Sequence, residues 1–223
     1  MKKIFCALAA SLLLLSALAG CSTGPDLTEY VSEYRSDLFS GTDGKYTITA
    51  SYSEREHPYE ADGNPGKMSR LFEVALSAAD NTKTYSISYT LAGKTYTDEL
   101  SFDSVRMVHT CSRSLPQPTE KSITFSVTDA EGTVADIGAT SVKSEKALSL
   151  EDLLQAVSTA EKERFAALTS GNHFAGELYV RLLCENEQNF YYIGLTDKNG
   201  ETYAMLADAE TGEIVATRNN RQD

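Results

Sequence analysis

The chain has 223 residues, with 32 acidic and 20 basic side chains and a formal net charge of −12. A surface this acidic repels the phosphates of nucleic acids and the headgroups of anionic lipids, so we expect no nucleic-acid partner. Tryptophan is absent, whereas the twelve tyrosines and the many threonines and serines favour β-strands.

The first twenty residues have the organisation of an export signal. Lys2 and Lys3 precede an almost entirely apolar run over residues 4–18, which is shorter than a membrane-spanning helix. Removing residues 1–20 leaves a mature chain of 203 residues with 18 basic and 32 acidic side chains, a net charge of −14. That length suffices for one large or two small domains.

The signal ends in Leu18-Ala19-Gly20-Cys21, which resembles the lipobox of bacterial lipoproteins at all four positions. The resemblance implies that the Gly20–Cys21 bond is cut and that Cys21 carries the lipid at the new N-terminus. A secretory signal followed by a chance cysteine and a short transmembrane anchor are the alternatives. We expect a protein anchored to the cell membrane by its lipid and facing outside the cytoplasm.

Residues 21–43 are predicted to form a lipidated tether and then a short amphipathic helix. The apolar side chains between residues 26 and 39 recur at helical spacing, as Leu27, Tyr30, Val31, Tyr34 and Leu38. Asp26 can cap the start of this helix, and Gly41 can end it.

Residues 44–143 alternate apolar side chains with threonine and serine, which is typical of strands with one dry and one wet face. We count seven short strands, the clearest running from Tyr85 to Leu91 before the turn Ala92-Gly93-Lys94. Two sheets would bury their dry faces against each other, so we predict an antiparallel β-sandwich of immunoglobulin-like architecture.

Residues 143–147 are polar and are predicted to separate this region from an α+β domain over residues 148–223. Ser149 can cap a helix that runs to Thr169, and Gly171 can stop it. Four strands are predicted to follow as an antiparallel meander, at residues 177–185, 189–196, 202–207 and 213–218.

The end of the chain resembles the tail of PepSY-type domains, in which a D-x-x-T-G-x-[IV] turn joins the last two strands. Asp208, Thr211, Gly212 and Ile214 occupy the positions of that pattern. The resemblance implies a regulator or inhibitor of a secreted peptidase, although the order of one helix and four strands departs from the usual PepSY layout. The mature chain also resembles small lipoproteins of Gram-positive bacteria, a likeness that implies no activity.

His109 and Cys111 lie two residues apart on a predicted strand and so share one face. Such a pair can supply a thiolate nucleophile for a hydrolase, but the sequence indicates no third group to orient it, and a pair of core residues is the alternative. Cys111 and Cys184 are 73 positions apart, and the sequence leaves open whether they form a disulfide or stay as separate thiols.

Three other groups of side chains are candidate binding sites. Glu54, Glu56, His57 and Glu60 could bind a divalent cation, but they match no ligand motif. Asp197, Asn199 and Glu201 resemble part of a calcium loop and also suit a hairpin turn. Tyr89, Tyr96, Tyr191 and Tyr192 could line a glycan or peptide groove or serve as ordinary strand residues.

The catalytic motifs G-x-S-x-G and H-E-x-x-H, the Walker loop and the dinucleotide fingerprint do not occur in the sequence. We therefore expect a non-enzymatic envelope protein without catalytic residues, cofactor or metal, which presents its surfaces to a protein, a peptide or a cell-wall polymer. A PepSY-like regulator is the alternative function, followed by a Cys–His hydrolase.

Overall fold

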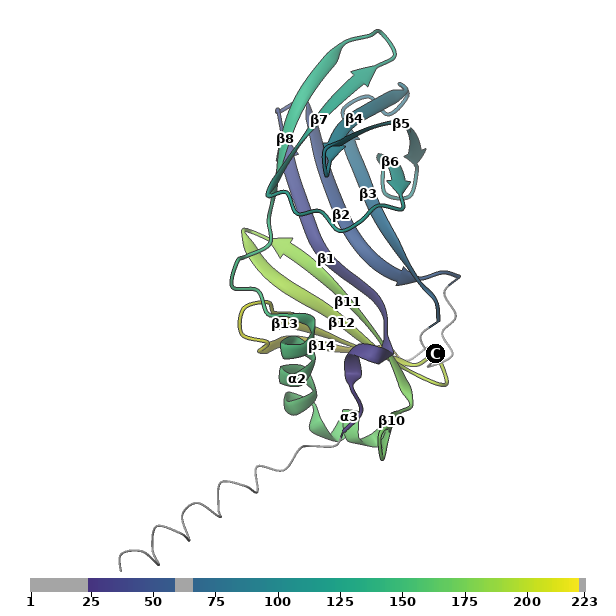
Figure 1. Ribbon diagram of the computed structural model, residues 1–223, viewed down its shortest axis with the longest axis vertical. Coiled ribbons are helices and arrows are strands. Elements are labelled where there is room, and N and C mark those ends of the chain that lie inside the picture. Colours follow the sequence, from purple (N-terminus) through teal and green to yellow (C-terminus); the bar gives the residue numbers. More distant parts are fainter. Residues whose placement is uncertain (1–23, 59–65, 221–223) are drawn as a thin grey trace, which may run out of the picture.

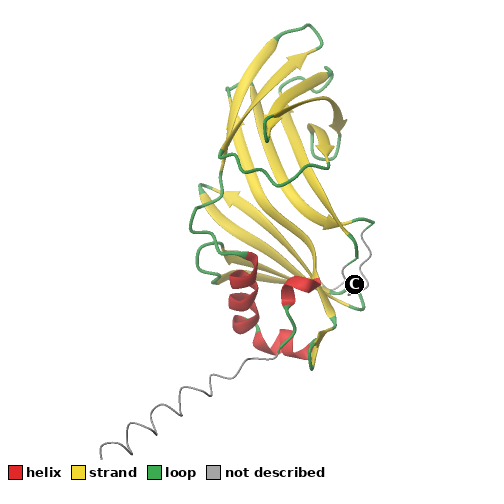
Figure 2. Cartoon of the chain, viewed as in Figure 1, coloured by secondary structure: helices red, strands yellow, loops and turns green. Residues whose placement is uncertain are grey.

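A computed structural model describes residues 24–58 and 66–220, and 58% of these residues lie in β-strands. The described part contains two α-helices, α2 (Leu150–Ala160) and α3 (Lys162–Ala167), and a short 3-10 turn, η2 (Leu27–Tyr30). No helix in these ranges has the length and apolar character needed to cross a membrane. The protein is therefore β-rich, and its helices gather in the lower part of Figure 2.

Eight strands close into an antiparallel barrel, which occupies the upper half of Figure 1. They are β1 (Val31–Thr42), β2 (Tyr46–Glu56), β3 (Met68–Ala78), β4 (Tyr85–Leu91), β5 (Lys94–Asp103), β6 (Val108–Arg113), β7 (Ser122–Asp129) and β8 (Val134–Ser141). Their order around the ring is β1-β2-β3-β6-β5-β4-β7-β8, and β8 pairs with β1. The ring is closed where Phe39 lies opposite Ser141 and Ser40 opposite Thr140.

The predicted β-sandwich over residues 44–143 is therefore wrong, although its seven strands are present as β2–β8. An open sandwich leaves unpaired edges on its outer strands. Here β1 pairs with both β2 and β8, so that closure satisfies the edges that a sandwich would expose.

Side chains fill the interior of the barrel. Inward-facing residues alternate along each strand with outward-facing ones, as in the buried positions Tyr46, Ile48, Ala50 and Tyr52 of β2. Aromatic rings from different strands meet inside, and the rings of Phe72 and Tyr89 lie 5.6 Å apart between centroids. An eight-stranded barrel is just narrow enough for side chains to fill it, which explains this large aromatic core.

The predicted helix over residues 26–39 is also wrong: after the single turn of η2, the chain continues as β1. The pairing of β1 shifts register between Val31 and Glu33 and again between Arg35 and Asp37. Such bulges disturb the alternation of a strand, which is why the apolar spacing here imitates a helix.

The first half of β1 also belongs to a second region, because Val31–Arg35 pairs in parallel with β11. Strands β11 (Gly176–Glu185), β12 (Gln188–Asp197), β13 (Thr202–Asp208) and β14 (Ile214–Asn220) then follow as an antiparallel meander. One face of the meander packs on α2 and α3 around a core of its own, which includes Leu153, Val180 and Ile193. The predicted single helix is divided at Glu161, and two-residue strands β9 (Thr169–Ser170) and β10 (His173–Phe174) follow it.

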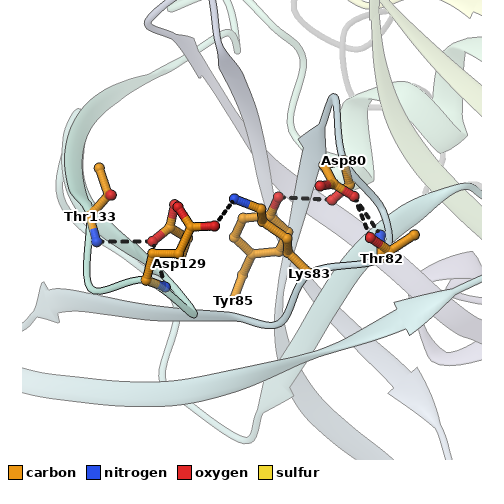
Figure 3. Close-up of polar contacts among 7 residues, drawn as sticks. Asp80, Thr82, Lys83, Tyr85, Asp129 and Thr133 are labelled. Atoms are coloured by element: carbon orange, nitrogen blue, oxygen red, sulfur yellow. Dashed lines mark hydrogen bonds and ion pairs between the residues drawn. The ribbon is translucent and has the colours of Figure 1, made fainter.

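A network of polar contacts joins the β3–β4 loop to the β7–β8 turn (Figure 3). Lys83 forms an ion pair of 2.7 Å with Glu131, and the Tyr85 hydroxyl donates to the backbone carbonyl of Asp80. The Asp129 carboxylate accepts two backbone N–H groups of its own turn. Each of these charged groups therefore has a partner, which fits a structural role at this end of the barrel.

Candidate anion-binding site

The predicted lipidation and cleavage residues, Gly20 and Cys21, lie outside the described residues, and so does Glu60 of the proposed cation cluster. The cut and the lipid at Cys21 stay predictions. The other residues proposed from the sequence fall in described parts of the chain, where their surroundings can be compared with the expected chemistry.

The structure gives the His109–Cys111 pair the surroundings of a core rather than of a nucleophile. Both residues lie on β6, where His109 is 2% exposed and Cys111 packs against the barrel core. Burial raises the pKa of the Cys111 thiol to about 12, so it is protonated at neutral pH. Burial also lowers the pKa of His109, whose Nε2 atom is buried and has no hydrogen-bond partner among the described residues.

Cys111 and Cys184 do not form a disulfide, because both are free thiols in the structure. Cys111 belongs to β6 of the barrel, whereas Cys184 belongs to β11 of the meander. The sequence left open a disulfide or two separate thiols, and the structure contains the two separate thiols.

Two of the candidate cation ligands, Glu54 and Asp197, are engaged in other contacts, whereas Glu56 is buried and His57 is exposed. Glu54 accepts a hydrogen bond of 2.8 Å from the Tyr52 hydroxyl and pairs with Arg70. The Asp197 carboxylate accepts the backbone N–H groups of Asn199 and Glu201, which closes the β12–β13 turn. No group of three or more potential metal ligands was found in residues 24–58 and 66–220.

The four tyrosines considered as a groove are separated by the fold. Tyr89 is buried inside the barrel with its ring stacked on Tyr96, at 5.7 Å between centroids. Tyr191 is buried in the meander core and donates to the carbonyl of Leu148, whereas Tyr192 points from the opposite face. Of the two alternatives for these tyrosines, their positions match ordinary strand residues, because Tyr89 and Tyr191 belong to two different cores and the neighbouring Tyr191 and Tyr192 point in opposite directions.

The PepSY-like residues build the β13–β14 turn. Asp208 accepts the backbone N–H of Thr211 at 2.9 Å and its hydroxyl at 3.0 Å. Gly212 has φ +73°, and a side chain there would also collide with Ala156 of α2. These residues are accounted for by the local geometry of the turn and by its packing on the helix.

A pocket of about 360 Å³ lies where the barrel adjoins the meander, on the face of the sheet opposite to both cores. We call it the arginine pocket, because four of the nine arginines of the chain line it. Its lining residues are Glu33, Arg35, Ser51, Ser53, Arg55, Leu71, Glu73, Arg106, Arg181, Leu183 and Tyr192. With two glutamates among them, the lining carries a formal net charge of +2 on a chain of net charge −12.

Strand pairing brings these distant residues into one row. Arg35 of β1 lies opposite Arg181 of β11 on one side and opposite Ser53 of β2 on the other. Arg181 in turn lies opposite Tyr192 of β12. A single line of cross-strand neighbours therefore crosses from the meander to the barrel through β1.

Two of the arginines are neutralised within the pocket. The Arg181 guanidinium donates to both carboxylate oxygens of Glu33, at 2.8 and 2.7 Å. Arg106, in the β5–β6 turn, donates to Glu73 at 2.8 Å. These pairs fix the orientation of the two guanidinium groups.

The other two arginines have no carboxylate partner among the described residues. Arg35 is half-buried and donates from Nε to the carbonyl of Leu182 at 3.1 Å. Burial, and then repulsion by Arg181, lowers the pKa of the Arg35 guanidinium, although an arginine stays charged at any physiological pH. Arg55 is exposed and makes no side-chain hydrogen bond or ion pair within the described ranges. The pocket thus has an excess of positive charge that its own residues do not neutralise.

Aromatic rings flank one side of the arginine pocket. Tyr192 lines it, and its ring lies 5.9 Å from that of Tyr179. Tyr179 lies over Gly194, where a Cβ atom would meet the ring at 1.9 Å. Only glycine leaves room for this ring, so the sheet surface beside the pocket is shaped for the two tyrosines.

A larger groove of about 670 Å³ lies between η2, α2 and α3. Its walls mix apolar side chains such as Leu154 and Phe165 with charges of both signs, such as Asp26 and Lys162. It lacks the one-sided charge of the arginine pocket, and it begins at Gly24, the first described residue. We therefore take the arginine pocket as the candidate site.

Sequence reasoning missed the arginine pocket. Its charged residues span positions 33–181, and no spacing between them matches a motif. The available signal is the alternation of polar residues on the outward faces of strands, but the sequence predicts a helix over residues 26–39, which hides most of β1. No protein-family model matches the chain, and the curated proteins include no significantly similar sequence.

Proposed function

We propose that this chain is a lipid-anchored, extracytoplasmic binding protein with no catalytic role, and that its anionic ligand occupies the arginine pocket. The lipobox at Cys21 supports the anchor. The observation that carries the binding role is the position of Arg35 directly opposite Arg181 in the sheet, with only one carboxylate, Glu33, paired to them.

Like charges on directly opposed strand residues destabilise a sheet. A protein that only needed a stable sheet would gain by a neutral residue at position 35. An anion bound between the guanidinium groups would remove the repulsion, and arginine is well suited to this because its planar group binds carboxylate and phosphate with two parallel hydrogen bonds.

The surroundings of the nucleophile candidates support a non-catalytic role. The thiol and imidazole of Cys111 and His109 belong to the barrel core, and the pKa of the thiol is raised. In the arginine pocket, both carboxylates accept hydrogen bonds from guanidinium groups, so they are already engaged within the protein.

The binding role is tested by thermal unfolding of the full-length protein in detergent, in sulfate, malonate or phosphate at constant ionic strength. A ligand that binds only the folded state raises the unfolding temperature. We expect a rise for the natural protein and for Arg218→Met, which removes an exposed arginine outside the pocket, and no rise for Arg35→Met. If all three anions leave the natural protein unchanged, or act equally on Arg35→Met, the proposal is wrong.

The anchor is tested separately by replacing Cys21 with serine. We expect the natural protein to partition into the detergent phase with an intact mass that includes acyl chains, and the variant to stay in the aqueous phase. Detergent partitioning of the variant would contradict the lipid anchor and leave the pocket proposal untouched.

A further inference from the structure

We infer that the arginine pocket selects the dianionic phosphate group of a small, soluble phosphomonoester, held mainly by Arg35 and Arg55. This inference rests on the proposed anion-binding function and specifies its ligand class. It follows from the charge balance of the pocket, from its hydrogen-bond donors, from its size and from the charge of the whole chain.

The charge balance favours a ligand with two negative charges. Arg181 pairs with Glu33 and Arg106 pairs with Glu73, so these four groups are neutral as a set. Arg35 and Arg55 remain, and they contribute the net charge of +2. A phosphomonoester carries about −1.5 to −2 at pH 7, which matches this excess more closely than a single carboxylate does.

The donors favour phosphate over carboxylate. The Nε atom of Arg35 is held by the carbonyl of Leu182, which leaves both terminal nitrogens of its guanidinium for a ligand. Ser51 and Ser53 line the same pocket on β2, and their hydroxyls make no side-chain hydrogen bond within the described residues. Two guanidinium groups and two hydroxyls suit the three terminal oxygens of a phosphate better than the two of a carboxylate.

The size of the pocket and its walls indicate a small ligand. About 360 Å³ is at the lower end of the range for small-molecule sites. Leu71, Leu183 and Tyr192 provide apolar surface beside the charged groups, against which a short carbon skeleton could pack.

The charge of the chain disfavours a polyanion. A membrane of anionic lipids or a polymer of phosphodiesters would bring many negative charges close to a chain of net charge −12. A single small ligand avoids this repulsion, because its charge lies within the pocket and the rest of the acidic surface is screened beyond roughly 8 Å at physiological salt.

The dianion also predicts a characteristic pH dependence. The second pKa of a phosphomonoester is near 6, so the dianion is the main species at pH 7 and about a tenth of the total at pH 5. The charged side chains that line the pocket are glutamates and arginines, and none of the lining residues is a histidine. The change in affinity across this range therefore comes from the ligand.

The test is calorimetric titration of the full-length protein in detergent with glycerol 3-phosphate, with glycerol and malonate as matched probes. We expect glycerol 3-phosphate to bind, glycerol not to bind and malonate to bind at least about tenfold more weakly. Affinity for glycerol 3-phosphate should fall by up to about tenfold from pH 7 to pH 5. Arg35→Met and Arg55→Met should each weaken binding by at least about tenfold, whereas Arg218→Met should have little effect.

The contrary outcomes separate this inference from the function on which it rests. Equal affinity for malonate and glycerol 3-phosphate, lost in Arg35→Met, would overturn the phosphate preference and leave anion binding intact. Tighter binding to phosphatidate vesicles than to glycerol 3-phosphate, also lost in Arg35→Met, would replace the soluble ligand by a lipid headgroup. Absence of binding by every anion would overturn both proposals, and Arg55→Met, an exposed position, keeps the test valid if Arg35→Met folds poorly.

Discussion

The strands that line the arginine pocket have two very different faces. On β3, Phe72 points into the barrel and is fully buried, whereas the next residue, Glu73, lines the arginine pocket. On β11 and β12, Leu182 and Tyr191 are buried in the meander core, whereas their neighbours Arg181 and Tyr192 line the pocket. A difference of one residue along a strand thus separates the core from the candidate site.

The comparison of the two strand faces indicates that the outer face is the one on which residues can be chosen for binding. The inner face is close-packed, so each of its residues is constrained by stability. The outer face contains an arrangement that stability does not favour, because Arg35 lies opposite Arg181. Charge that is left unbalanced on an otherwise ordinary sheet is a better indicator of binding than a large groove. Four substitutions test this distinction.

Phe72→Ala should have the largest effect. The side chain is fully buried, and its removal should lower the free energy of unfolding by about 3–5 kcal/mol through the lost burial and the cavity that remains. Urea unfolding measures this change. Val105→Ala is the control, since this side chain is 91% exposed and should change stability by less than about 0.5 kcal/mol. Similar values for the two variants would contradict a packed barrel interior.

Gly41→Ala should disrupt the closure of the barrel. A Cβ atom at this position would meet the backbone oxygen of Gly138 at 2.3 Å, so β1 and β8 must move apart at their seam. We expect a loss of about 1–3 kcal/mol in urea unfolding. Gly138→Ala, across the seam, has open space around its Cβ atom and should be nearly neutral. A neutral Gly41→Ala would contradict the β1–β8 pairing.

His109 should make the stability of the barrel sensitive to pH. Burial lowers its pKa in the folded state, so the unfolded chain binds the proton more readily. Its contribution is fully present above the unfolded pKa of about 6.5 and is lost as pH falls below that value, by at most about 1.4 kcal/mol per pH unit. Urea unfolding between pH 5 and 7 measures the slope. The slope of stability against pH should flatten in His109→Gln. It should persist in His173→Gln, which changes an exposed histidine. Equal slopes in the natural protein and both variants would contradict a contribution from His109.

Arg35→Met should have the smallest effect on stability, despite its large expected effect on binding. The variant loses one hydrogen bond to Leu182 but also the repulsion by Arg181, so we expect a change within about 0.5 kcal/mol of zero. Arg181→Met is the contrasting variant, because it leaves Glu33 without its bidentate partner and should cost more. If Arg35→Met proved the more damaging of the two, Arg35 would be a structural residue.

Local patterns predicted most strands and failed where a strand has several partners. Residues 85–91 alternate regularly between buried and partly exposed positions, and the sequence predicts them as a strand with those limits. In β1 the two register shifts break the alternation, and Tyr34 and Leu38 pack against the meander core at a spacing that imitates a helix. That error also concealed the eighth strand, and with it the closure of the barrel.

The candidate site could be predicted even less well. Arg35 and Arg181 are separated by 146 positions and become neighbours only through the parallel pairing of β1 with β11. Glu54 and Tyr89, which are candidate site residues by their type and spacing, are engaged with Tyr52 and with the barrel core. Residue type and local spacing therefore indicated side chains that are used for packing and local contacts. They missed the charged side chains that the fold brings together in the arginine pocket.

The acidic charge, the strand-rich composition and the approximate limits of most strands follow from residues close together in the chain, and so does the lipobox-like pattern on which the predicted anchor rests. The closure of the strands into a barrel, the membership of β1 in two regions and the pocket shared by four arginines become visible in the folded chain alone. These features depend on pairing between residues up to about 150 positions apart. Such pairing is selected by the burial of whole faces and the satisfaction of strand edges, which no local pattern encodes.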